Sequence, residues 1–411
     1  MSDPVNFVAN WLKTVFTNWG VSPTWTTIII SIIGVVVLAG VALVIDIFLV
    51  WVERKVVARF QDRLGPNRLG PFGLFQPIAD VIKLLLKEDI TPDKADKFLF
   101  NLAPVLALGM AIALWAVVPL APTVIGSDLN VGVLYIVAIG SISTLGIIIA
   151  GWASNNKFAL VGAFRMVAQM ISYEIPMVIS LLIPVILAGS MGINSIVKSQ
   201  PVWYIVLAPV AALIFLISSQ AELGRAPFDI SEAESEIVAG FHIEYTGMKF
   251  GLFYAGELLH ALTIGGFFSC FFLGGWRGWG AETYPILGIV YFFIKAFFMY
   301  WVIMWIKYTF PRIRIDQMLN LNWKFLTPLA LAALIMTALL DKIFQNASSV
   351  VYIIVMLGGN LVLLYIAYLV TGIYARVERK KVASPEDNRV NFPIKSGANI
   401  VETQSSERVQ A

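Results

Sequence analysis

Residues 220–250 read QAELGRAPFDISEAESEIVAGFHIEYTGMKF, and this stretch decides how the rest of the chain must be arranged. It places a cluster of acidic residues between two segments that are apolar enough to cross a bilayer; these are Glu222, Asp229, Glu232, Glu234, Glu236 and Glu244. Acidic side chains beside a membrane must stay hydrated, be paired or hold a proton, and each of these has a cost. The cluster therefore predicts a loop at the membrane edge that handles protons or the polar head of a ligand.

The composition is that of a polytopic membrane protein. Of the 411 residues, 58% are hydrophobic and only 13% are charged, whereas a soluble chain has about 25% charged residues. The mean hydropathy is +0.80. The formal net charge of +3 comes from 29 basic and 26 acidic residues. Because the basic residues form no stripe along the chain, we expect no nucleic-acid partner.

A helix that crosses a bilayer needs about 20 apolar residues, and nine stretches of the sequence meet this requirement. They are residues 28–52, 98–120, 131–153, 160–189, 202–219, 251–273, 285–309, 326–344 and 350–374. The sequence thus predicts an all-α polytopic membrane protein with about nine transmembrane helices. We expect an interfacial helix in residues 1–24, a transmembrane domain over residues 25–375, and a flexible polar tail over residues 376–411.

The distribution of positive charge predicts the orientation of the chain. Most of the 29 Lys and Arg residues fall in the connections after the first, third, fifth, seventh and ninth predicted spans. The opposite side carries only Lys13, Lys198, Arg277 and Lys342, while Lys295 lies within a span. Because positively charged connections stay in the cytoplasm, we expect the N-terminus outside, and the C-terminus and the acidic loop in the cytoplasm.

The segment after the first predicted span contains an amphipathic helix. Gly65-Pro66 and Gly70-Pro71 force turns. The apolar residues that follow recur at helical spacing, and they are Leu74, Phe75, Ile78, Val81, Ile82 and Leu85. Asp80, Lys83 and Lys87 interrupt them on the other face, a pattern typical of a helix lying along the membrane surface. Such a helix can cover a cavity that admits an amphiphile from the lipid, or it can simply stabilise the bundle.

Four ionisable residues lie within the predicted spans, namely Asp46, Glu174, Glu257 and Lys295. Each central charge costs about 2.5–3.5 kcal/mol on insertion scales, so four unpaired charges would cost about 10 kcal/mol. We therefore expect a polar interior in which these groups are paired, hydrated or neutral, although acids near span ends can also reach up to water. Glu174 precedes Pro176, whose missing N–H leaves a backbone carbonyl free, and we expect water to bind it.

The sequence lacks ligands for a redox centre of its own. Cys270 is the single cysteine, so we expect no internal disulfide, thiolate-ligated cluster or zinc site. The two histidines, His242 and His260, could join a proton relay. We expect no cofactor bound covalently or by metal ligation, and we expect any electron carriers to belong to partner subunits.

Four blocks of sequence carry a resemblance to a known family. They are residues 53–88 (ERKVVARFQDRLGPNRLGPFGLFQPIADVIKLLLKE), 151–177 (GWASNNKFALVGAFRMVAQMISYEIPM), 221–254 (AELGRAPFDISEAESEIVAGFHIEYTGMKFGLFY) and 311–324 (PRIRIDQMLNLNWK). In these blocks and in their order, the chain resembles the H-subunit family of bacterial proton-pumping NADH:quinone oxidoreductase, respiratory complex I.

The resemblance implies a multi-pass subunit of the bacterial cytoplasmic membrane. Its implied partners are the quinone-module subunits of the hydrophilic arm and the neighbouring small and antiporter-like membrane subunits, with quinone as a shared substrate. By matching motif positions, the implied quinone chamber contains Glu53, Arg54, Arg63, Asp80, Phe228 and Lys307. The implied proton-coupling funnel contains Glu174, Glu222, Glu232, Glu234, Glu236 and Glu257. The family core has eight helices, so the ninth predicted span and the tail carry no implied function.

Some positions depart from the family pattern. Lys307 stands where the family often has arginine, which keeps the charge but not the planar guanidinium. Leu258 follows Glu257 where the family commonly has tyrosine, so the chain keeps the acid but loses the phenol beside it. Ser231 replaces a rigid proline, so we expect a more mobile loop.

Two other functions remain open. A hydrogenase-linked or ferredoxin-linked proton pump has a homologous membrane subunit that need not use quinone, but the complete block RLGPNRLGPFGLFQPIAD favours quinone. A stand-alone ion transporter is a different class of protein. Transporters usually show inverted repeats or paired broken helices around a midplane site, and neither pattern is evident in the sequence.

Overall fold

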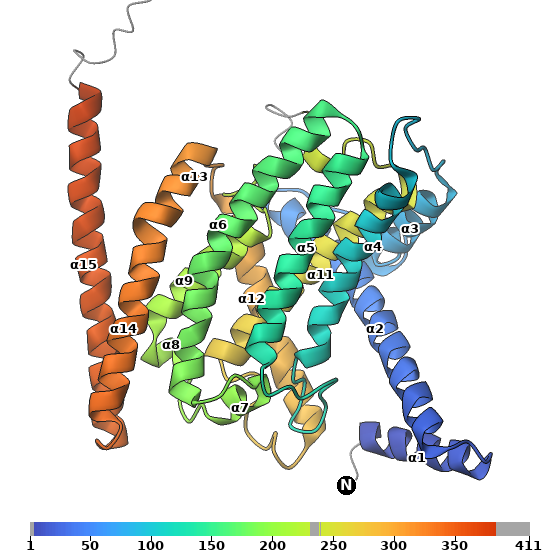
Figure 1. The fold of residues 1–411 in the computed structure, drawn as a ribbon, viewed down its shortest axis with the longest axis horizontal. Coiled ribbons are helices and arrows are strands. Elements are labelled where there is room, and N and C mark those ends of the chain that lie inside the picture. The colour runs from blue at the N-terminus through green and yellow to red at the C-terminus, as the bar shows by residue number, and fades with distance from the viewer. Residues whose placement is uncertain (1–3, 231–237, 239, 384–411) are drawn as a thin grey trace, which may run out of the picture. The chain divides into compact units, whose positions relative to one another are not determined.

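The computed structural model describes residues 4–230, 238 and 240–383, which form helices joined by turns, without strands (Figure 1). Within these residues, eight helices are long and apolar enough to cross a membrane. They are α2 (Pro23–Phe60), α4 (Lys97–Leu114, continued by η2, Trp115–Val117), α5 (Gly132–Ala153), α6 (Lys157–Ala188), α11 (Gly247–Phe272), α12 (Pro285–Thr309), the continuous pair α13 and α14, and α15 (Ser349–Ala383). The predicted all-α polytopic architecture is confirmed.

Shorter elements connect these helices. They are α1 (Pro4–Asn18), η1 (Pro71–Gly73), α3 (Gln76–Leu86), α7 (Ile193–Lys198) and η3 (Gly240–His242). α3 is the amphipathic helix predicted after the first span, and it packs against α2 and α11. α13 (Ile315–Leu321) runs into α14 (Thr327–Phe344) through a π-helical turn, Asn322–Leu326.

The fifth predicted span, residues 202–219, is a broken helix. It forms α8 (Tyr204–Leu207) and α9 (Pro209–Glu222), which are separated at Ala208, where φ is −136° and ψ is 62°. Pro209 has no N–H with which to continue the hydrogen-bond ladder. With 14 residues, α9 is about 21 Å long, which is shorter than the hydrocarbon core. α9 packs against α6 and α14, so the break is inside protein rather than in lipid.

Residues 1–361 form one compact unit, and a second unit begins at residue 362, inside α15. The described part of the second unit is the rest of that helix, which ends at Ala383. Residues 376–383, with which the predicted polar tail begins, are the end of α15, and the division of the chain into an interfacial segment, a transmembrane domain and a polar tail stays a prediction. Residues 384–411 lie outside the described part.

Helix α11 is the central helix of the first unit. In its most apolar 18-residue window 83% of the residues are buried, compared with 33% for α12. Small residues allow close approach, because a Cβ at Gly265 would lie 2.7 Å from the carbonyl oxygen of Ala296 in α12. α4 packs against α5, and α5 packs against α6. α11 packs against α4 and lies behind these three helices in the view of Figure 1. Every residue of α11 from Leu258 to Phe272 except His260 is buried.

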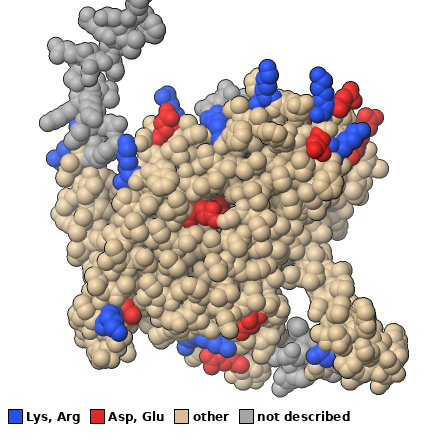
Figure 2. All heavy atoms as spheres, viewed as in Figure 1, with Lys and Arg blue, Asp and Glu red and all other residues tan. Residues whose placement is uncertain are grey.

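Charge is distributed as a membrane requires. Figure 2 shows Lys, Arg, Asp and Glu gathered near two opposite ends of the face that carries α4, α5 and α6, with a broad uncharged band between them. One acidic patch interrupts that band. Because charges are costly in the hydrocarbon core, an acid in this band calls for a specific explanation.

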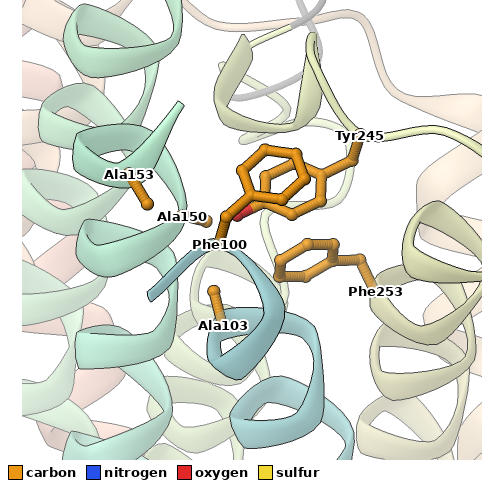
Figure 3. Close-up of a cluster of buried hydrophobic side chains, with 6 residues drawn as sticks. All are labelled: Phe100, Ala103, Ala150, Ala153, Tyr245 and Phe253. Carbon is orange, nitrogen blue, oxygen red and sulfur yellow. The ribbon is translucent and has the colours of Figure 1, made fainter. Parts of the chain in front are cut away.

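An aromatic cluster anchors the end of the acidic loop (Figure 3). The ring of Tyr245 stacks on Phe100 of α4, with centroids 4.1 Å apart and an interplanar angle of 4°. Phe253 of α11 packs edge-on against Tyr245 at 4.9 Å, and Ala150 and Ala153 of α5 close the cluster. Burial raises the pKa of the Tyr245 phenol, which stays neutral. The cluster fixes the point at which the loop enters α11.

Candidate functional site

An apolar pocket of about 390 Å³, here called the outer pocket, lies between α2, α3 and α11. Most of its lining is aliphatic, and it includes Leu43, Ile47, Val50, Val81, Leu84 and Met248. Its charged lining comes from α2 and α3, where Arg54 pairs with Asp80 and the Lys83 ammonium lies 3.3 Å from the second Asp80 oxygen. A pocket of this kind suits an amphiphile with a long apolar part and a polar head.

Arg225 is the centre of a buried ionic cluster that joins α2, α11 and α12. Its Nε donates to Glu257 Oε1 at 2.8 Å, and its Nη2 lies 3.8 Å from Glu53 Oε2. The other Glu53 oxygen accepts from Lys307 Nζ at 2.9 Å and from the Tyr308 hydroxyl at 2.7 Å. Burial lowers the pKa of Arg225, but the carboxylates of Glu53 and Glu257 outweigh this and raise the pKa well above its usual range. Two cations thus balance two carboxylates.

A second cavity of about 90 Å³, here called the inner cavity, adjoins the outer pocket. Phe250 and Tyr254 line both, so these side chains form the wall between them. The carboxyl and imidazole groups on the inner cavity are those of Glu222, His242, Glu257 and His260. Its volume can hold about three water molecules, and although most of its lining is apolar, these groups provide hydrogen-bond partners for them. Burial lowers the pKa of His242, although Glu257 opposes the shift, so the imidazole is neutral at pH 7.

A third cavity of about 20 Å³ continues the series of polar groups. Glu174, Glu222 and His260 line it, and the last two also line the inner cavity. Glu174 accepts a hydrogen bond from the Ser141 hydroxyl of α5. Acidic and imidazole groups therefore follow one another from the wall of the outer pocket to α6.

The structure brings together some of the residues singled out in the sequence. Glu53 pairs with Lys307 and Arg54 with Asp80. Arg63 donates to the side chain of Gln61 at 2.7 Å and lines a separate hollow with Arg54. Their roles in a quinone chamber stay predictions.

Glu174, Glu222 and Glu257 line the inner and third cavities, whereas Phe228 lines none of the three cavities. Phe228 is 3% exposed and packs against the ring of Tyr173 at 5.2 Å. Glu232, Glu234 and Glu236 fall in residues 231–237, outside the described residues.

Sequence reasoning missed Arg225 and Tyr308 as site residues. Arg225 is the only arginine in residues 220–250, and an isolated arginine among many acids was the available signal. Its side chain is 1% exposed, which no local pattern reveals.

The ionisable residues within the spans are accommodated in different ways. Asp46 is 6% exposed, lines the outer pocket, and its Oδ1 has no hydrogen-bond partner among the described residues. Lys295 donates to three backbone carbonyls after α11, those of Leu273, Gly275 and Arg277, at 2.8–2.9 Å. Lys295 thus caps the C-terminal end of α11 and lines none of the three cavities described above.

Known proteins match this chain over most of its length. The model of the NADH dehydrogenase family matches residues 32–338. The NADH-quinone oxidoreductase H subunit of Dehalococcoides mccartyi (strain CBDB1) is 49% identical over 308 residues, which cover 75% of this chain and 86% of the relative. A second H subunit, from Geobacter sulfurreducens, is 50% identical over 308 residues, covering 72% and 92%. The H subunit of Brevibacillus brevis is 45% identical over 326 residues, covering 79% and 97%. The chain therefore belongs to the NADH dehydrogenase family.

Proposed function

We propose that this chain, as a membrane subunit of an NADH-quinone oxidoreductase, admits quinone from the lipid and couples its reduction to proton translocation. One observation carries the proposal: Phe250 and Tyr254 line both an apolar pocket and a cavity that carries carboxyl and imidazole groups. A quinone has a long apolar tail and a polar ring, which match the lining of the outer pocket. The carboxyl groups of Glu222 and Glu257, which line the inner cavity, match the need of quinone reduction for protons.

The proposal includes the setting of the chain. Its partners are hydrophilic-arm subunits that hold the electron carriers, together with small and antiporter-like membrane subunits, in the bacterial cytoplasmic membrane. This chain holds no redox cofactor, and quinone is a substrate shared with the arm. The charged ends and uncharged band of Figure 2 support a bilayer setting, and the basic connections support a cytoplasmic acidic loop.

The proposed mechanism is electrostatic. Reduction of a quinone by two electrons requires two protons, so charge changes in a region shielded from water. Glu257 is bonded to Arg225, which also faces Glu53, so a change at one carboxyl alters the balance at the other. Interacting carboxyl groups titrate as a set. Uptake or release of a proton by Glu257 is then passed to Glu222 and Glu174, which line the adjoining cavities.

A charge exchange at the polar lining of the outer pocket tests quinone access. In Arg54→Asp, two carboxylates face each other where the Arg54–Asp80 ion pair was, and like charges repel. The double variant Arg54→Asp/Asp80→Arg restores a pair of opposite charges. We expect KM for a short-chain quinone to rise about tenfold in the single variant, equivalent to about 1.4 kcal/mol, and to recover partly in the double variant. The measurement is NADH:quinone reductase activity in membranes.

Electron transfer from NADH to a soluble acceptor is the control for this experiment, and we expect it to be unchanged. Equal loss of both activities would instead indicate failed assembly. A KM for quinone that is the same in all three proteins would refute access through this pocket. A photoreactive quinone analogue should label this chain, and absence of labelling would favour the related pumps that do not use quinone.

A further inference from the structure

One backbone carbonyl of helix α6 lacks its usual hydrogen-bond donor because a proline lies inside the helix. Pro176 has no N–H, so the carbonyl of Ser172, four residues earlier, lacks its helical donor. Such a group inside a membrane protein needs another partner. Asn322, which is 0% exposed, donates from Nδ2 to this carbonyl at 2.6 Å. The protein thus provides the hydrogen bond that was expected from water.

Asn322 lies at an irregular point of its own helix. It is the first residue of the π-helical turn between α13 and α14, a feature found frequently at functional sites. A second bond joins the same elements, because the Tyr173 hydroxyl donates to the carbonyl of Met318 in α13 at 2.9 Å. α6 is therefore bonded to α13 and the π turn at two consecutive residues, immediately before Glu174.

The preceding turn of α6 is bonded to the start of the acidic loop. Gln169, also 0% exposed, donates from Nε2 to the carbonyls of Ala221 and Phe228, both at 2.7 Å. Ala221 directly precedes Glu222. One turn of α6 therefore connects the position of Glu174 to that of Glu222, and both carboxyl groups line the cavity of about 20 Å³.

We propose that Asn322 is a positioning residue that fixes Glu174 relative to Glu222, with Gln169 fixing the Glu222 side. Two carboxyl groups across so small a cavity influence each other's protonation, and the strength of this coupling depends on their separation. Without the Asn322 amide, the Ser172 carbonyl must find water or shift, and Glu174 moves with it. The inference rests on the proton-coupling part of the proposed function.

The test uses the complete membrane complex and the variant Asn322→Leu, which keeps the size of the side chain but removes the donor. We expect the rate of proton translocation to fall about tenfold and the pH profile of quinone reduction to shift, while electron transfer to a soluble acceptor is unchanged. Pro176→Ala restores an N–H to α6. In a Pro176→Ala background, Asn322→Leu should therefore have little effect.

Asn360→Leu is a matched control. Asn360 in α15 is also 0% exposed and donates to backbone carbonyls, those of Leu207 and Met356, at 2.9 Å each. We expect Asn360→Leu to lower the thermal stability of the complex about as much as Asn322→Leu does. The pH profile of quinone reduction should stay unchanged. If Asn322→Leu prevents assembly, the Asn322→Leu/Pro176→Ala protein, which has no orphaned Ser172 carbonyl, should assemble and show the normal profile.

Three results would overturn the inference: an assembled Asn322→Leu complex with a normal pH profile, no rescue by Pro176→Ala, or a shift of the same size in Asn360→Leu. Glu174→Gln and Glu222→Gln separate this failure from failure of the proposed function. If these two variants lose proton translocation and Asn322→Leu does not, only the positioning role is wrong. If neither carboxyl variant changes translocation, the proposed proton path itself is wrong.

Discussion

Arg225→Met will lower the amount of assembled complex and its NADH:quinone reductase activity by about 100-fold or more. Removing one partner of a buried ionic cluster costs about 3–5 kcal/mol, because the other charges remain buried without compensation. Here Glu257 would lose the donor at 2.8 Å, and among the described residues Glu53 would keep only Lys307 as a cationic partner. The measurements are the yield of intact complex on native gels and the quinone reductase rate in membranes.

An exposed arginine provides the comparison for Arg225. Arg312 pairs with Asp229 at 2.9 Å, but its side chain is 39% exposed. Exposed ion pairs contribute about 0–1 kcal/mol, so Arg312→Met should leave yield and rate close to normal. Arg225→Lys should lose less activity than Arg225→Met because it keeps the charge while losing the guanidinium geometry. Full activity in Arg225→Met would show that the buried cluster is dispensable.

Glu257→Gln will abolish quinone reduction coupled to proton translocation while electron transfer from NADH to a soluble acceptor continues. Glutamine keeps the shape of the side chain but neither carries the charge that balances Arg225 nor exchanges a proton at neutral pH. We expect a loss of coupled activity of at least about 100-fold, or about 2.7 kcal/mol in transition-state free energy. Both rates are measured in the same membranes.

Glu282→Gln is the control for this variant, because Glu282 is exposed in the connection between α11 and α12, and it should behave as the unmodified protein does. Equal loss of both rates in Glu257→Gln would indicate failed assembly, whereas normal translocation would remove Glu257 from the proton path. We expect the same separation of rates for Glu234→Gln, a prediction from sequence alone, since Glu234 lies outside the described residues.

The transmembrane helices could largely be predicted from the sequence. The stretch 131–153 became α5, Gly132–Ala153, and the stretch 285–309 became α12 with the same bounds. The bilayer requires each span to be a continuous apolar segment that satisfies its own backbone, so local sequence is sufficient. The fifth stretch differs because its break at Ala208 is buried against other helices, where a buried Asn360 accommodates the carbonyl of Leu207.

The candidate site was predictable only residue by residue. Asp46, Glu174 and Glu257 stand out because carboxyl groups are costly in apolar surroundings, and α3 stands out by its periodicity. Glu53 and Lys307 were singled out only by the family resemblance. The pairing of these groups was not predictable, because nothing in the local sequence says which charge of one helix will face which charge of another.

By itself, the sequence determined the class of fold, the helices and the titratable side chains, since each of these depends on a short stretch of chain in contact with lipid or water. Only the tertiary structure decided that Arg225 lies between Glu53 and Glu257 and that an amide from a π turn reaches the carbonyl freed by Pro176. The physical reason is that electrostatic and hydrogen-bond partners are chosen by distance in space. That distance is set by how α2, α6, α11 and α13 pack together, and it is independent of their separation along the chain.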